Sequence, residues 1–181
     1  VTSNLYFTKR SSLNQSEVSR VSLFGMHSVL GSTNEDDPLM WHSEDSGSFQ
    51  VYFNKKSRYS PDGYFELSSS TGVFQAVSSS IIPRVYDNTH WALAVRIGKK
   101  SFVDFNAIPT GSSNQYAIEL IGYEYELDTL KNTFKLSSNI SGDDFDKLSK
   151  QDKALYLGSH KTNFSGSHLD SSDVRAFGIS A

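Results

Sequence analysis

The stretch His90-Trp91-Ala92-Leu93-Ala94-Val95-Arg96-Ile97 decides the fold of this chain. Trp91 begins a row of large apolar residues at every second position, and small or polar residues fill the positions between them. A period of two places these two sets on opposite faces of a β-strand. Because one face is heavily apolar, a second layer has to cover it. Gly98-Lys99-Lys100 is expected to end the strand, and Ser101-Phe102-Val103-Asp104-Phe105 to return as the second strand of a hairpin.

Short apolar runs separated by polar turns recur along the rest of the chain, which is typical of a β-sandwich. The expected strands are residues 4–8, 18–29, 48–53, 64–67, 72–77, 115–127, 132–137, 154–158 and 173–180. One helix is expected over Ser141–Lys153, where Ser141 or Asp143 would cap it and Phe145 with Leu148 forms a short apolar stripe. We therefore predict an all-β fold, an antiparallel two-sheet β-sandwich with at most one short helix.

Length and composition fit one such domain. The 181 residues lie within the size range of a single sandwich, and 13% of them are aromatic, which suits large packed sheet faces. Gly25, inside an apolar run, is expected to mark a bulge or a close backbone approach. The predicted core residues are Trp91, Leu93, Val95, Phe102, Phe49, Val51, Phe53 and Phe177. We expect residues 1–181 to be one module of a longer polypeptide.

Charge and cysteine content restrict the classes of partner and chemistry. The net charge of −3 and the pI of about 5.9 predict no nucleic-acid partner, which would need clustered Lys and Arg. The chain has no cysteine, so disulfides, thiolate chemistry and cysteine-based zinc sites are excluded. No apolar run approaches the ~18 residues of a membrane span, so no membrane partner is predicted.

Several motifs, in their order along the chain, resemble the laminin-G-like and concanavalin-A-like jelly rolls. They are Gly63-Tyr64-Phe65-Glu66-Leu67, the Trp91 strand, Leu155-Tyr156-Leu157-Gly158 and the closing run Asp173-Val174-Arg175-Ala176-Phe177-Gly178-Ile179-Ser180. In that group a tryptophan opens the central hairpin, a Leu-Tyr-Leu-Gly strand follows late, and the last strand packs beside the first. The resemblance implies a jelly roll of the kind found in lectins, adhesion modules, phage or virion surface proteins and some glycan hydrolases, and fold alone does not choose among these.

Glu124-Tyr125-Glu126-Leu127-Asp128 is the sharpest candidate for catalysis. On a strand, Glu124, Glu126 and Asp128 share one face, and two carboxylates ~5–5.5 Å apart could act as nucleophile and acid/base in a retaining hydrolase. The order Glu-x-Glu-x-Asp differs from the Glu-x-Asp-x-Glu order of the glycan hydrolases that the resemblance brings in. We therefore interpret the motif as the solvated face of a strand, and predict that the protein is not an enzyme.

Metal sites find little support in the sequence. Gly158-Ser159-His160 and Gly166-Ser167-His168 repeat a pattern that could form a two-histidine metal site or a Ser–His pair, but loop spacing fixes no geometry, so we interpret them as loop polarity. Glu35-Asp36-Asp37 and Asp143-Asp144-Asp146 lack the spaced Asp/Asn–Gly pattern of a calcium loop. We predict no cofactor and no metal ligand; calcium at a loop rim is the alternative that the resemblance implies.

Two features of the sequence are candidates for binding: a basic cluster that contains a tyrosine, and a tryptophan beside a histidine. The candidate binding residues are Lys55, Lys56, Arg58, Tyr59, Trp41 and His42. Arg and Lys beside an aromatic ring suit a sugar or a phosphate, and a solvated loop guarding a strand end is the competing interpretation. An exposed Trp41 would suit sugar stacking, whereas a buried one would belong to the core, which we favour.

These observations predict a non-catalytic recognition or assembly module, displayed on an extracellular or virion surface in an oligomeric context. Loops at one edge of the sandwich would contact protein neighbours in a surface assembly or a cell-surface glycan, because rigid sheets hold loops still and binding then costs little ordering entropy. A glycan-binding lectin is the first alternative. A hydrolase that uses Glu124, Glu126 and Asp128 is the second.

Overall fold

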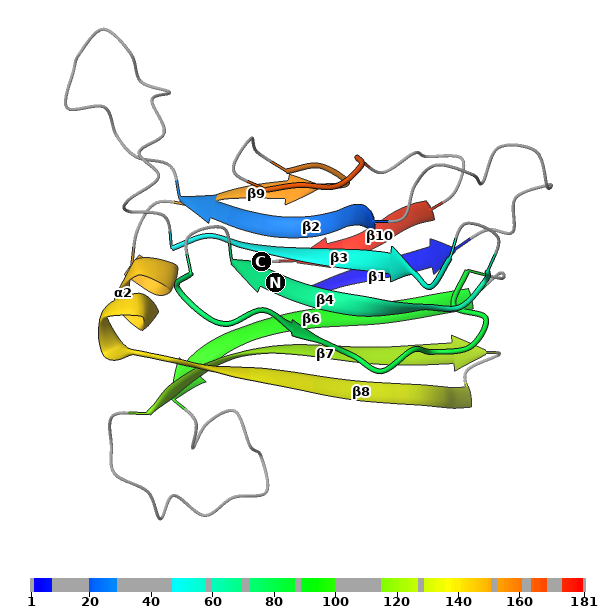
Figure 1. Cartoon of the computed structure of the whole chain (residues 1–181), viewed down its shortest axis with the longest axis horizontal. Coiled ribbons are helices and arrows are strands. Elements are labelled where there is room, and N and C mark those ends of the chain that lie inside the picture. Colours follow the sequence, from blue (N-terminus) through cyan, green and yellow to red (C-terminus); the bar gives the residue numbers. More distant parts are fainter. Residues whose placement is uncertain are drawn as a thin grey trace, which may run out of the picture.

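Two antiparallel β-sheets packed face to face make up the chain (Figure 1). This computed structural model describes residues 2–7, 20–28, 47–57, 60–69, 72–86, 89–99, 115–126, 129–150, 153–160, 164–168 and 174–180. Sheet A contains, in spatial order, β10 (Val174–Ser180), β1 (Thr2–Phe7), β6 (Thr89–Lys99), β7 (Tyr116–Glu126) and β8 (Thr129–Ile140). Sheet B contains β5 (Val77–Ser78), β4 (Gly63–Ser69), β3 (Phe49–Lys55), β2 (Arg20–Ser28) and β9 (Lys153–Leu157). The predicted all-β sandwich is confirmed.

The first and last strands of the described chain lie side by side in sheet A. In the register of the sheet, Thr2 of β1 is opposite Ser180 of β10 on one side and Ala94 of β6 on the other. β1 therefore joins β10 to the strand that carries Trp91. This arrangement has the last strand beside the first, as the resemblance implied.

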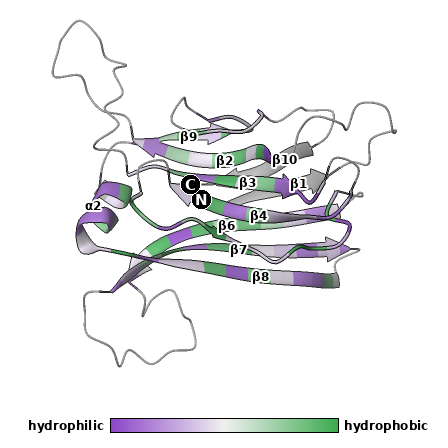
Figure 2. Ribbon diagram, viewed as in Figure 1, coloured by the Kyte–Doolittle hydropathy of each residue, from purple (hydrophilic) through white to green (hydrophobic). Residues whose placement is uncertain are grey.

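The core lies between the sheets and is built around Trp91. Its indole ring is fully buried, with centroids 5.0 Å from the Phe65 ring of β4 and 5.9 Å from the Phe134 ring of β8. The indole N–H is also satisfied, because it donates to Thr89 Oγ1 at 3.1 Å. Figure 2 shows hydrophobic bands on β2, β3, β6 and β7.

Most of the predicted core is confirmed. The buried members are Trp91, Leu93, Val95, Phe49, Val51 and Phe53. Phe102 lies outside the described residues, and Phe177 lies in β10, where side chains are not described. The large residues of β6 point inward and its alanines point outward, as the alternating pattern predicted.

The predicted strand ends are less accurate. Gly98 and Lys99 do not end the Trp91 strand but continue β6, because they pair with Ala117 and Tyr116 of β7 and the ladder outweighs the poor strand propensity of glycine. The strand neighbours of β6 are β1 and β7, and the predicted hairpin partner, residues 101–105, lies outside the described residues. The strand predicted at residues 72–77 is wrong, since only Val77 and Ser78 form β5.

Gly25 marks a close approach, and the bulge lies nearby. The register between β2 and β3 shifts between Ser22 and Phe24, two residues before the predicted position. A Cβ on Gly25 would overlap the Gln50 side chain and the Phe49 carbonyl oxygen of β3. Both features expected at this glycine are therefore present, but on separate residues.

The single described helix, α2 (Gly142–Lys150), follows β8 directly. Ser141 caps it as predicted: its Oγ accepts from the Asp144 backbone N–H at 3.0 Å. Leu148 is buried in the core, and the Phe145 ring stacks on Tyr116 at 4.3 Å. The helix stops at Lys150, earlier than predicted, and Lys153 begins the edge strand β9.

A covering segment, residues 158–160 and 164–168, lies on the outer face of sheet B. Its backbone binds β2: Gly158 N–H donates to Leu23 O at 2.7 Å, and Ser167 pairs with the backbone of Arg20 and Ser22 at 2.9 Å. The Phe164 ring is buried against the His27 ring, with centroids 4.7 Å apart. Every residue of β3 is buried, and the covering segment contributes by contacting Gln50 and Tyr52 on its outward side.

Candidate functional site

The two described members of the predicted basic cluster have separate partners. Lys55 is only 9% exposed, and its Nζ lies 5.0 Å from the centroid of the Tyr86 ring. Lys56 is exposed and forms an ion pair with Asp62 at 3.7 Å. Both lysines therefore contact groups of their own domain. The remaining predicted binding residues, Arg58, Tyr59, Trp41 and His42, lie outside the described residues.

The carboxylates of the candidate catalytic motif also have partners on the neighbouring strand. Glu124 Oε2 accepts a hydrogen bond from Asn132 Nδ2 at 2.5 Å, and Glu126 forms an ion pair with Lys131. Asp128 lies outside the described residues. Glu126 is exposed, but Glu124 lies opposite the buried Trp91 in the register, on the face of β7 that is turned inward. The predicted solvated face is therefore wrong for Glu124, and the outer face of this stretch carries the tyrosines instead.

The opposite face of the same β7 stretch exposes aromatic rings. Tyr123 is 38% exposed and Tyr125 is 37% exposed, and Leu130 of β8 beside them is 51% exposed. The two tyrosine rings have centroids 6.5 Å apart. We call these three residues the tyrosine surface; it lies on the outer face of sheet A, where β7 ends and β8 begins.

Cross-strand register explains why the tyrosine rings are exposed. Directly opposite residues in an antiparallel sheet share a face, so Tyr123 has Ala92 of β6 and Thr133 of β8 as its neighbours. Both neighbours are small, which leaves the Tyr123 ring uncovered from either side. The face of β6 that carries small residues such as Ala92, which the sequence pattern predicted, therefore lies next to the tyrosine surface.

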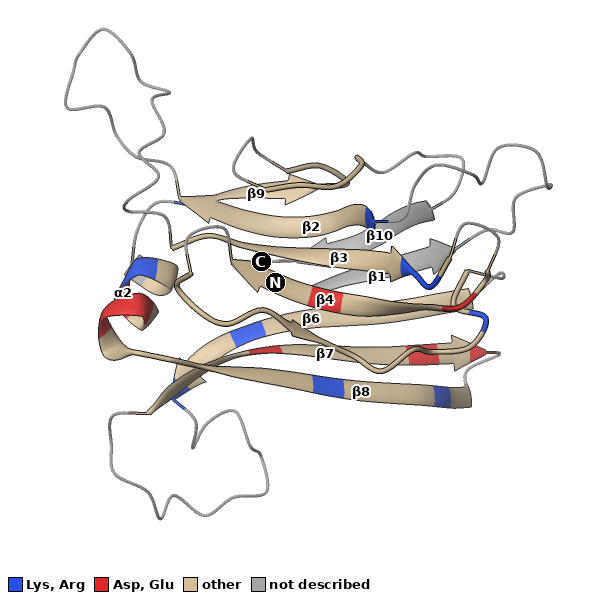
Figure 3. Cartoon of the chain, in the orientation of Figure 1, with Lys and Arg blue, Asp and Glu red and all other residues tan. Residues whose placement is uncertain are grey.

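Farther along the same face, charged residues replace the tyrosines. The Glu119 carboxylate of β7 lies between two cations, with Arg96 of β6 at 3.4 Å and Lys135 of β8 at 3.0 Å. Its side chain is only 5% exposed, so these two partners offset the desolvation of the charge. Figure 3 shows acidic positions of β7 beside basic positions of β6 and β8.

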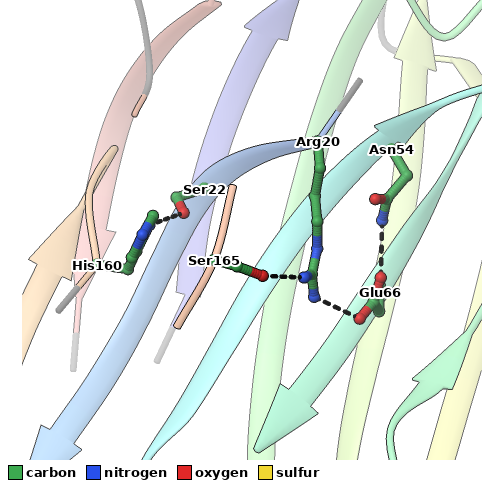
Figure 4. A network of polar contacts seen from close by, with 6 residues as sticks. All are labelled: Arg20, Ser22, Asn54, Glu66, His160 and Ser165. Carbon is green, nitrogen blue, oxygen red and sulfur yellow. Dashed lines mark hydrogen bonds and ion pairs between the residues drawn. The ribbon is translucent and has the colours of Figure 1, made fainter. Parts of the chain in front are cut away.

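Sheet B carries a polar network beneath the covering segment (Figure 4). Arg20 on β2 donates to Glu66 Oε1 at 2.6 Å and to Ser165 Oγ at 2.8 Å. Glu66 on β4 also accepts from Asn54 Nδ2 at 2.9 Å, so the carboxylate joins β2 to β3 and β4. The guanidinium carbon lies 3.7 Å from the centroid of the Tyr52 ring, in cation–π contact.

Tyr52 supplies the ring beneath the Arg20 guanidinium in this network. Its side chain is fully buried, and burial raises the pKa of its phenol to about 12, while nearby Arg20 opposes the shift. The Ser165 backbone lies close enough to lower this pKa, and the hydroxyl has no hydrogen-bond partner of good geometry among the described residues. Tyr52 therefore stays neutral and serves as an apolar platform for Arg20.

The two histidines of the repeated Gly-Ser-His pattern meet at the edge of this network. The centroids of the His160 and His168 rings are 4.9 Å apart, with the rings nearly perpendicular at 84°. His160 Nδ1 also lies 2.6 Å from Ser22 Oγ of β2 (Figure 4). The interpretation of this repeat as loop polarity did not anticipate either contact.

The repeat itself was the only signal for the histidine pair. Its geometry depends on the covering segment, which turns back so that Ser167 reaches β2 beside β9. Burial and the neighbouring His168 and Arg20 lower the pKa of His160 from its ordinary value of 6.5. His160 is therefore uncharged at neutral pH.

Comparisons with protein-family models, curated proteins and solved structures found no match to the chain. Within the described ranges, no group of three or more His, Asp or Glu side chains lies close enough together to hold a metal ion. The helix of the described chain is too short and too polar to cross a membrane.

Proposed function

We propose that this protein is a non-catalytic recognition or assembly module and that the tyrosine surface is its contact site. The observation that carries this proposal is the exposure of Tyr123, Tyr125 and Leu130 together on one face of a paired strand. Tyrosine is enriched in protein contact sites because its large ring loses little conformational entropy on binding. This position differs from the loop edge that the sequence favoured.

The supporting backbone makes the tyrosine surface rigid. β7 pairs with β6 from Tyr116 to Tyr125, and with β8 on its other side. The opposite face of the three strands packs into the Trp91 core. A preorganised surface of this kind binds without first ordering its backbone, so more of the contact energy is available for affinity.

A glycan is the second candidate ligand, and the exposed rings favour it. The faces of tyrosine rings suit the apolar faces of sugar rings, and Thr133 and His90 lie beside the two tyrosines on the same face of the sheet. In this form the module would be a lectin of the concanavalin-A-like jelly-roll type. The β1–β10 pairing and the late Leu155–Gly158 motif support that type, which in turn supports an extracellular or virion surface setting.

The experiment compares the wild-type chain with a Tyr123→Ala/Tyr125→Ala double variant and with Ile81→Ala as the control. Ile81 is 49% exposed and lies outside the tyrosine surface. Each protein is screened on a glycan array and tested for self-association by sedimentation velocity. We expect the wild type to bind in one assay, the double variant to lose at least about tenfold in affinity, which corresponds to ~1.4 kcal/mol, and the control to match the wild type.

Binding that survives in the double variant contradicts the assignment of the contact site. A wild-type chain that neither self-associates nor binds any glycan contradicts the recognition function itself. Circular dichroism of all three proteins has to show the same β-rich spectrum, so that loss of binding is not loss of fold.

A further inference from the structure

The backbone of the covering segment brings His160 and His168 together. Ser159, next to His160, accepts a hydrogen bond through its carbonyl oxygen from Gln50 Nε2 of β3 at 3.3 Å. Ser167, next to His168, makes two backbone hydrogen bonds to β2 at 2.9 Å each. Each histidine therefore follows a residue that is hydrogen-bonded to sheet B. These bonds hold the backbone at both positions, and the two ring centroids are 4.9 Å apart.

The nitrogens of the two rings have unequal roles. His160 Nδ1 is engaged with Ser22 Oγ at 2.6 Å, and Ser22 is fully buried on β2. When Ser22 Oγ accepts from an Nδ1–H, the lone pair of His160 is on Nε2, which makes no hydrogen bond to the described residues. In proteins, a histidine that binds a metal through one ring nitrogen is usually oriented by a hydrogen bond from its other ring nitrogen to a second group.

We propose that His160 and His168 together bind one divalent transition-metal ion of the Zn²⁺, Ni²⁺ or Cu²⁺ class, through one ring nitrogen each. An imidazole nitrogen lies ~2.0–2.1 Å from such an ion, so two imidazoles on one ion have ring centroids roughly 4.6–5.3 Å apart. The observed 4.9 Å lies in this range. His168 is exposed, so its ring can turn to present a nitrogen and water can complete the coordination.

Arg20 repels a cation at the histidine pair, but its own ion pair reduces that repulsion. Arg20, the cation near the pair, already has the Glu66 carboxylate at 2.6 Å. An anion would have to compete with that carboxylate, whereas a metal ion meets a guanidinium that is already paired.

Nitrogen donors also select the kind of metal. Imidazole suits Zn²⁺, Ni²⁺ and Cu²⁺, whereas Ca²⁺ and Mg²⁺ prefer carboxylate, carbonyl and water oxygens. The proposed ion therefore differs from the calcium that the resemblance implied. It also lies on sheet B, away from the tyrosine surface on sheet A, so the two proposals are independent.

The test uses the full chain, stripped with a chelator and titrated with ZnCl₂ and NiCl₂ at pH 7.5 in an isothermal titration calorimeter. We expect one ion per chain, and affinity reduced at least about tenfold in His168→Ala. His90→Ala is the matched control, because His90 lies on β6 in the other sheet; it is expected to bind as the wild type does.

A second measurement holds even if a variant is poorly folded. The electron paramagnetic resonance spectrum of the wild-type chain with one equivalent of Cu²⁺ should show two nitrogen ligands. The proposal is overturned if His168→Ala binds like the wild type, if His90→Ala loses binding instead, if CaCl₂ displaces the ion as well as ZnCl₂ does, or if the copper spectrum shows no nitrogen pair.

Discussion

At the scale of single residues, Gly122 decides how the aromatic core closes. It lies on β7 opposite Leu93 of β6 and Phe134 of β8, on the face that is turned inward. A Cβ at this position would overlap the Phe134 ring. That ring in turn stacks on Phe65, with centroids 5.1 Å apart, and Phe65 contacts Trp91. The Phe134 ring therefore occupies the space that a side chain at position 122 would need.

We predict that Gly122→Ala destabilises the protein. The added methyl group displaces the Phe134 ring from its stack, and overpacking of this kind costs about 1–3 kcal/mol. Urea denaturation followed by tryptophan fluorescence measures the loss in the free energy of unfolding. Gly142→Ala is the control: its Cβ would lie 3.7 Å from Tyr116, an ordinary contact, at the first position of α2. A Gly122→Ala variant as stable as this control would refute the role of the glycine.

At the scale of the elements, Lys153 holds four pieces of the chain together. Its Nζ donates to Ser28 Oγ of β2 at 2.7 Å, to Gly47 O before β3 at 2.7 Å and to Lys147 O of α2 at 2.5 Å. A lysine near the end of a helix suits the negative end of the helix dipole. The first residue of β9 thereby connects the end of β2, the residue two before β3 and the last turns of α2.

The stability of the protein should depend on the titration of Lys153. Burial lowers the pKa of its amine from 10.5 in the unfolded chain to about 8 in the fold. Between these two values the unfolded chain binds more protons, so the free energy of unfolding contributed by this lysine rises as pH increases from about 8 to 10.5. Lys153→Met removes the titration. Urea denaturation across this range should show the wild type gaining stability relative to the variant; parallel curves for the two proteins would contradict it.

At the scale of the whole molecule, the sandwich depends on contacts between distant parts of the sequence. Thr2 pairs with Ser180, and Arg20 of β2 is hydrogen-bonded to Ser165 and Ser167. Such contacts form only after long loops have closed, and the loop entropy has to be overcome before they stabilise the chain. Folding and the assembly of the histidine pair are therefore coupled.

We predict slow refolding, on the scale of milliseconds to seconds that is typical of non-local all-β folds. Stopped-flow dilution from urea, followed by the fluorescence of the two tryptophans, of which Trp91 is buried in the core, measures this rate. The Ser22–His160 contact should form in the same phase, because both residues belong to the interface between β2 and the covering segment. Refolding within microseconds would show that local contacts dominate instead.

Much of the fold was predictable, because its signals are local. The alternation on Trp91, Leu93 and Val95 identified a strand with a buried face, and Ser141 identified the start of the helix. The extent of β6 was not predictable, since the partner that keeps Gly98 and Lys99 in the ladder lies in β7.

The candidate sites were less accessible to sequence reasoning. Tyr123 and Tyr125 carried no motif, because their exposure depends on the small residues that β6 and β8 place beside them. Lys55 carried the charge expected of a surface residue, yet it is nearly buried beside Tyr86. In both places the deciding neighbour lies on another strand.

The sequence by itself determined the all-β class, the inward row of Trp91 and the cap of α2, because hydrophobic period and capping act over a few residues. Only the tertiary structure decided which strands are neighbours, which tyrosines are exposed and that His160 meets His168. The physical reason is that strand pairing is chosen by the burial of whole faces against each other, and this choice brings together residues whose separation in sequence carries no information about their distance.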